Sequence, residues 1–108
     1  MNVKSIGNFE TGYSTSSFNK TYTLEKNSTY IAMIASRCSS STANGNGRMS
    51  VTTTNATKTN LIINKSKETM CLLSYIINTD DSGSSSAKFT VAPDGWTMQS
   101  SGGIIKIN

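Results

Sequence analysis

Two apolar stretches decide the fold: TYIAMIASRC at residues 29–38 and TMCLLSYIIN at residues 69–78. In an extended strand, successive side chains point to opposite faces. On one face, the first stretch then carries Tyr30, Ala32, Ile34, Ser36 and Cys38. On the other face, it carries Ile31, Met33, Ala35 and Arg37. Both faces are mostly apolar near the middle, which is expected for a strand covered on both sides or lying at a subunit contact.

The second stretch shows the same two-sided pattern. Its alternate positions Met70, Leu72, Ser74 and Ile76 oppose Cys71, Leu73, Tyr75 and Ile77. A helix is the competing interpretation, but flanking turn residues leave only about ten positions, and isolated helices of that length are marginal. The helix formers Ala, Glu and Leu are also scarce there, so a strand is favoured.

Shorter alternating segments and polar turns surround the two stretches. We expect further strands at residues 3–6, 13–18, 20–24, 48–54, 60–64, 87–92, 96–98 and 103–107. We expect turns or loops at residues 25–28, 39–47, 55–59, 65–68, 79–86, 93–95 and 99–102. Short strands at such spacing predict an all-β, single-domain antiparallel β-sandwich, with a jelly roll as one form of it. Residues 1–12 are expected to be an N-terminal lead-in, and residues 13–108 to form the sandwich.

The composition supports this architecture and excludes others. Of the 108 residues, 44 are Ser, Thr or Asn, 35% are hydrophobic and 15% are charged. Coiled coils are rich in Ala, Glu, Lys and Leu, and disordered chains have few aromatic or β-branched residues. This chain has eight aromatic residues, and its Ile, Val and Thr total 28, a composition typical of strands.

The net charge of +4 comes from ten scattered basic residues, of which only two are Arg. A nucleic-acid-binding protein would gather such charge on one face, so no nucleic-acid partner is expected. No run reaches the ~18 apolar residues of a membrane span, and residues 1–12 lack the apolar core of a secretion signal. A protein made in the cytoplasm whose surface composition suits an extracellular adhesive or shell is expected to be released by lysis, as virion components are.

The residues that enzymes usually employ are few. There is no His, which removes Ser-His-Asp and Cys-His catalysis and the commonest metal ligand. Paired catalysis by Asp80 or Asp81 with Asp94 is the remaining acid–base option. The stretch 78–83 resembles the start of a calcium loop, but Phe89 stands where the bidentate Glu belongs, so a hairpin loop is favoured. We therefore expect no enzyme activity, no cofactor and no metal.

Cys38 and Cys71 are the only cysteines. Two thiols without His cannot complete a zinc site. A disulfide between neighbouring strands and a pair of small buried apolar side chains both remain open, the second being typical of a reducing cytosol.

Aromatic side chains are the candidate ligand-binding residues. Trp96 follows the turn Pro93-Asp94-Gly95, Tyr13 lies in Ser/Thr-rich sequence, and Tyr22 belongs to the segment 20–24. Exposed Tyr and Trp rings stack on sugars or anchor interfaces. The other interpretation of Trp96 is that it fills the core beneath its turn, and this one is favoured.

The whole pattern resembles a family of small virion domains. The chain is all-β, free of His and rich in Ser, Thr and Asn; it begins at Met1, carries polar turns such as Glu25-Lys26-Asn27-Ser28, and closes with Pro93-Asp94-Gly95-Trp96 and the tail GGIIKIN. In this style it is similar to the β-sandwich domains of bacteriophage tail-fibre tips, baseplate receptor binders and capsid decoration proteins. The resemblance carries no residue roles.

The resemblance implies a non-enzymatic virion protein that assembles with itself, often as a trimer, and with other virion proteins. A host cell-surface glycan is the further partner it allows. Two alternatives stay open. One is a carbohydrate-binding module that uses Trp96, Tyr13 or Tyr22. The other is a small inhibitor that occludes a protein partner, although the strong single-sign charged face typical of such inhibitors is missing.

Overall fold

The computed structural model describes residues 3–41, 47–65 and 70–108 of the chain and builds them into eight strands. The strands are β1 (Lys4–Glu10), β2 (Phe18–Leu24), β3 (Thr29–Ser41), β4 (Arg48–Thr54), β5 (Ala56–Lys65), β6 (Met70–Thr79), β7 (Ser85–Ala92) and β8 (Trp96–Lys106). Among these described residues, no helix is long and apolar enough to cross a membrane.

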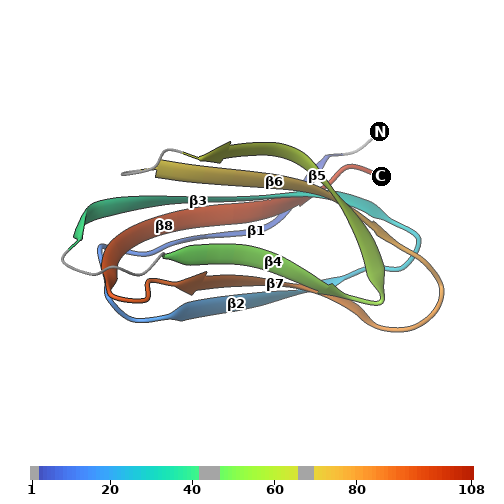
Figure 1. The fold of residues 1–108 in the computed structure, drawn as a ribbon. Coiled ribbons are helices and arrows are strands. Elements are labelled where there is room, and N and C mark those ends of the chain that lie inside the picture. Colours follow the sequence, from blue (N-terminus) through green and yellow to red (C-terminus); the bar gives the residue numbers. More distant parts are fainter. Residues whose placement is uncertain (1–2, 42–46, 66–69) are drawn as a thin grey trace.

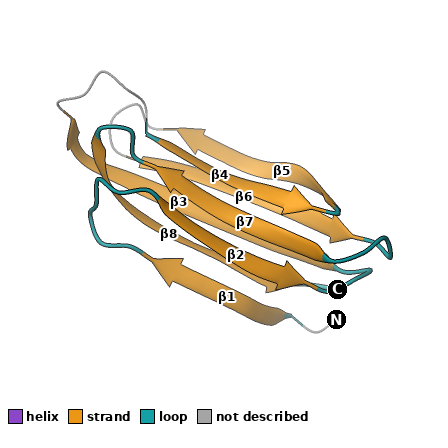
Figure 2. Ribbon diagram, turned by 90° about the horizontal axis from the view of Figure 1, so that it is seen from below, coloured by secondary structure: helices purple, strands orange, loops and turns teal. Residues whose placement is uncertain are grey.

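The strands form two antiparallel sheets packed face to face, which confirms the predicted β-sandwich. The five-stranded sheet has the order β1-β8-β3-β6-β5, and the three-stranded sheet has the order β2-β7-β4 (Figures 1 and 2). The two most apolar strands, β3 and β6, are neighbours in the five-stranded sheet and pair from Thr29 with Asn78 to Arg37 with Met70. The decisive stretches of sequence therefore lie side by side in the larger layer.

The core lies between the sheets and is built by alternation. On β3, Tyr30, Ala32 and Ile34 are fully buried, as their shared parity predicts. Phe89 of β7 sits opposite them and is also fully buried. Its ring makes edge-on contacts with Phe9 at 5.3 Å and Tyr22 at 5.6 Å between centroids, an arrangement that aromatic rings favour. Phe89 thus joins the N-terminal strand and β2 to one cluster.

The short strand expected at residues 3–6 of the lead-in is part of a longer strand that covers residues 4–10. This longer strand, β1, pairs with β8 along the edge of the larger sheet and buries Phe9. Residues 11–17, by contrast, cross from the larger to the smaller sheet. Thr11 donates its backbone N–H to the Ser100 carbonyl and Ser14 forms an isolated bridge with Met98, but no strand forms here. The strand predicted at 13–18 is therefore wrong except at Phe18, where β2 begins.

At two places where the sequence predicted a break between strands, the chain instead stays extended. Hydrogen bonds from neighbouring strands hold the polar residues there in strand conformation. The break expected at 99–102 does not occur, since β8 is central and pairs on both sides, with β1 and β3. The turn expected at 55–59 shrinks to Asn55, whose φ of 52° is left-handed, and β5 starts at Ala56 as a polar edge strand. The loop expected at 39–47 and the turn expected at 65–68 lie largely outside the described residues.

At Gly102 the core lies directly against the backbone of β8. Gly102 registers with Phe9 on β1 and Ile34 on β3, both of which face inward. A Cβ added there would lie 2.6 Å from the Phe9 ring and 2.8 Å from the Met33 carbonyl oxygen. Only a residue without a side chain lets the Phe9 ring occupy this space.

We expect Gly102→Ala to lower the free energy of unfolding by about 1–3 kcal/mol, the usual cost of forcing a group into a packed core. Urea denaturation followed by circular dichroism measures it. Gly12→Ala is the matched control, because a Cβ at Gly12 meets nothing within 4 Å. Equal stabilities of the two variants would contradict this account of Gly102.

Candidate functional site

The most distinctive surface is the side of the five-stranded sheet that faces away from the core, which we call the outer face. Its described apolar residues come from three adjacent strands: Ile31, Met33 and Ala35 of β3, Leu72 and Ile76 of β6, and Ile105 of β8. Met33 is 47% exposed, and the others are half-buried by one another. No described segment covers this face (Figure 1).

The opposite side of the sandwich is polar. The residues of the three-stranded sheet that point away from the core include Asn19, Thr21 and Thr23 of β2, Lys88 of β7 and Thr52 of β4. This is the usual hydrophobic-in, polar-out pattern of an antiparallel sheet with one wet side. The outer face of the larger sheet departs from that pattern, because three adjacent strands place apolar residues on it.

A groove of about 730 Å³ runs along the outer face over β8. Its floor lies at Gly103, which has Asn8 of β1 on one side and Met33 of β3 on the other. Because Gly103 carries no side chain, the sheet is hollow between these neighbours. Ile31 and Ile105 form the apolar end of the groove, and Glu10 lies at its polar end. The groove is therefore open and apolar, with a charged border.

A second hollow of about 320 Å³ continues from the polar end. Glu10 of β1 and Arg37 of β3 both line it, on opposite sides of β8, and both side chains are exposed. Within the described ranges the single ion pair is that of Lys106 with Glu25, so Glu10 and Arg37 have no charged partner there. The outer face thus offers one free carboxylate and one free guanidinium beside its apolar centre.

The predicted aromatic residues do not come together as a set. Tyr22 is only 9% exposed and belongs to the core, where burial raises the pKa of its phenol and its hydroxyl has no hydrogen-bond partner among the described residues. Its ring is therefore not available to a ligand in this conformation. Trp96 is half-buried and packs against the core, which agrees with the favoured interpretation. Tyr13 is 45% exposed in the β1–β2 connection.

The acidic residues considered for chemistry are dispersed. Asp80 and Asp81 lie before β7 and Asp94 lies after it, at opposite ends of that strand. Asp80 Oδ1 accepts hydrogen bonds from the Ser82 amide at 2.8 Å and hydroxyl at 2.5 Å, and these bonds lower the Asp80 pKa. In the described part of the chain, no three metal-ligating side chains cluster. This loop is thus held by hydrogen bonds of its own and by Asn27, whose side-chain amide donates to Asp81 Oδ1 at 2.6 Å.

Cys38 is half-buried and packs against the core, as expected for a small apolar side chain. The side chain of Cys71 lies outside the described part of the structure. Both interpretations of the cysteine pair, the disulfide and the two small apolar side chains, therefore stay open.

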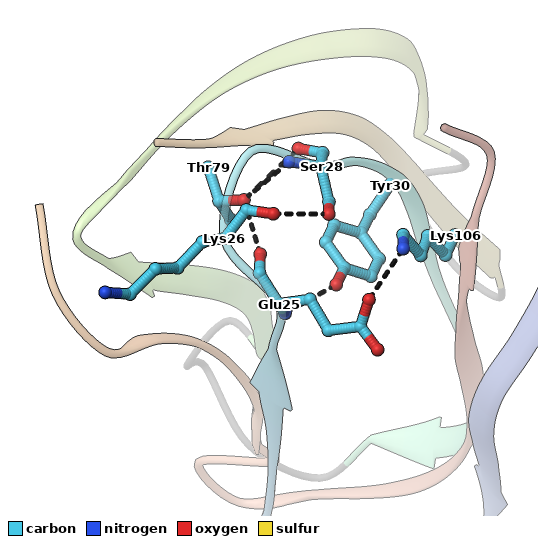
Figure 3. Close-up of polar contacts among 6 residues, drawn as sticks. All are labelled: Glu25, Lys26, Ser28, Tyr30, Thr79 and Lys106. Atoms are coloured by element: carbon cyan, nitrogen blue, oxygen red, sulfur yellow. Dashed lines mark hydrogen bonds and ion pairs between the residues drawn. The ribbon is translucent and has the colours of Figure 1, made fainter. Parts of the chain in front are cut away.

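A polar network lies at the end of the sandwich near the β2–β3 turn (Figure 3). Thr79 Oγ1 donates to the Glu25 carbonyl at 2.5 Å and accepts from the Ser28 amide at 3.0 Å. The hydroxyl of buried Tyr30 accepts from the Glu25 amide at 2.7 Å. Lys106 pairs with the Glu25 carboxylate at 2.6 Å, which lowers the Glu25 pKa and raises the Lys106 pKa. The network fastens β2, β3, β6 and β8 together.

Sequence reasoning identified the two-sided character of β3 but missed the groove. The signal for it is the pair Gly102-Gly103 between strand-forming residues, because glycine inside a strand marks a bulge or a close approach of backbone. The sequence around Glu10 and Arg37 does not indicate that they share a surface, because only the strand order β1-β8-β3 brings them together.

Comparisons with known protein families, with curated proteins and with solved structures find no match to this chain.

The Thr79 hydroxyl makes a testable contribution to the polar network at the β2–β3 turn. Thr79→Val would leave the buried Ser28 amide without its acceptor, so we expect a loss of about 1–3 kcal/mol in the free energy of unfolding. Thr21→Val on the polar face is the control, since Thr21 is exposed. Thermal and urea denaturation measure both variants, and a stability of Thr79→Val equal to that of the control would refute the role.

Proposed function

We propose that the protein is a non-catalytic structural module of a bacteriophage virion, in a tail, baseplate, fibre or capsid-decoration position. It works by protein–protein assembly and docks through the outer face of its five-stranded sheet. The observation that carries this proposal is the exposed apolar outer face, set against a polar face on the other sheet. The virion context rests on the resemblance in composition and turn style to phage β-sandwich domains, with which a two-sheet fold agrees.

The distribution of apolar residues supports an assembly role. Only 35% of the chain is hydrophobic, yet Met33, Ile31, Ile76 and Ile105 lie on the outer face rather than in the core. Burying apolar surface gains about 25 cal/mol per Å², and contiguous exposed patches on soluble proteins commonly mark interaction sites. A chain with so few apolar residues gains stability from them only when another surface covers them.

A particle-incorporation experiment tests this proposal. We expect the chain to be found by mass spectrometry in gradient-purified particles made from the genome that encodes it. Met33→Asp places a charge in the middle of the outer face and is expected to lower incorporation at least about tenfold, because docking would then bury an unpaired charge. Thr21→Asp, on the polar face, is the matched control.

Both variants alter exposed side chains, so circular dichroism should show the wild-type fold for each. Absence of the wild-type chain from the particles would refute the virion role. Normal incorporation of Met33→Asp would refute the outer face as the docking surface.

A carbohydrate-binding module is the second candidate, and one contact favours it. The Ser14–Met98 bridge holds the connection that carries Tyr13 against the start of β8, near Trp96 in sequence. Both aromatic residues thus lie at one end of the sandwich. Because Trp96 is the only tryptophan, its fluorescence reports directly on that end.

If sugars bind there, titration with bacterial surface glycans will shift Trp96 emission, and Tyr13→Ala will weaken the response about tenfold, the value of one stacking contact. Thr21→Ala, on the polar face, is the control for unspecific changes. Unchanged emission across a glycan series would eliminate this candidate.

A further inference from the structure

We propose that the partner of the outer face is a second copy of this chain, packed sheet to sheet about a twofold axis that runs along β8. This proposal rests on the proposed function, which makes the outer face the docking surface. It adds that a second copy of the chain docks there, and in which orientation. Homo-oligomers most often close by twofold symmetry, in which one self-complementary patch meets itself.

The shape of the outer face is self-complementary. Along one level of the sheet, Asn8, Gly103 and Met33 lie on β1, β8 and β3 in that order. Met33 projects, being 47% exposed, while Gly103 leaves the adjacent groove of about 730 Å³. A twofold axis along β8 places β3 of each copy over β1 of the other. The Met33 side chain of each copy then enters the groove beside Asn8 of the other.

The charges of the outer face are complementary under the same operation. Glu10 is on β1 and Arg37 is on β3, so β8 separates their strands by about 10 Å, twice the spacing of neighbouring strands. Neither has a charged partner among the described residues. The axis along β8 brings Glu10 of each copy to the Arg37 end of the other, and it makes two equivalent ion pairs at the border of the apolar contact.

The arrangement of these charges also favours a twofold dimer over a ring of three copies. A ring of three copies is built from two different patches, whereas Glu10, Arg37, Met33 and the groove all lie on one face. This patch carries a negative charge on one side of its central strand and a positive charge on the other. A twofold contact between two such patches places opposite charges of the two copies together. The expected assembly is therefore a dimer, instead of the trimer that the resemblance to phage domains implies.

A charge-reversal series tests the proposal. Glu10→Arg and Arg37→Glu each replace two attractive pairs with two repulsive ones, so each is expected to weaken dimerisation at least about tenfold. In the double variant the pairs are re-formed with opposite polarity, and its dissociation constant should return close to that of the wild type. An equimolar mixture of the two single variants should likewise form heterodimers, since each supplies the charge that the other needs.

Sedimentation equilibrium over a concentration series measures these constants, with Lys88→Glu on the polar face as the control that leaves them unchanged. Circular dichroism of dilute samples checks that each monomer is folded. A wild-type chain that stays monomeric at high concentration, a trimer, or a double variant and mixture that remain dissociated would each overturn the proposal.

These outcomes are separable from those of the particle experiment. A monomeric chain that still enters particles through Met33 overturns the dimer and leaves the virion role intact. A charge-dependent dimer that is absent from particles supports the interface and refutes the virion role.

Discussion

The two faces of β3 cannot both be buried inside a chain of this size. Its inner residues Tyr30, Ala32 and Ile34 are fully buried against the three-stranded sheet, and that sheet is the only layer that the described residues provide. Ile31 and Met33 then remain on the uncovered side. Since the parity of a strand is fixed, moving them inward would expel the core residues. The uncovered apolar face is thus a direct consequence of a strand that is apolar at consecutive positions.

A core can form from such a polar sequence because, in the described part of the chain, the Tyr22 hydroxyl is the only buried side-chain oxygen without a hydrogen-bond partner. Ser36 and Ser100 lie opposite each other on β3 and β8 and share a hydrogen bond of 2.8 Å inside the sandwich. Ser85 donates to the Asn55 carbonyl at 2.9 Å. Short hydroxyl side chains add little volume and need one partner each, so they cost little when they are paired. Part of the limited number of apolar residues can therefore lie on the surface while the core still forms.

The sequence predicted the strands that have a clear local pattern and failed where neighbouring strands decide the conformation. The strands β3 and β6 are apolar runs between polar turns and β4 alternates, and all three were expected within three residues of the observed ends. In β8, Ser100 and Gly102 look like a loop, yet hydrogen bonds from two neighbouring strands keep the chain extended. In β5, polar residues such as Thr57 and Thr59 belong to an exposed edge. Composition alone does not tell such a strand from a turn, because both are polar.

The candidate surface was predictable only in part, for the same reason. From the sequence alone, apolar residues at consecutive positions of β3 predicted a strand that is covered on both sides or lies at a subunit contact. The groove and the two charges depend on β1 and β3 being separated by β8, and strand order is a long-range property that local patterns do not encode. Tyr22 was a candidate ligand-binding residue, but the structure buries it in the core.

Gly102 and Gly103 connect the core to the surface. Because neighbouring strand residues face opposite ways, the missing side chain of Gly102 admits the Phe9 ring into the core, while that of Gly103 hollows the outer face. The Phe9 ring holds β1 against Phe18 at 5.0 Å and Phe89 at 5.3 Å. The same strand β1 carries Glu10 and the Asn8 side of the groove. A side chain at Gly102 would therefore disturb the outer face through the position of β1, although it would point into the core.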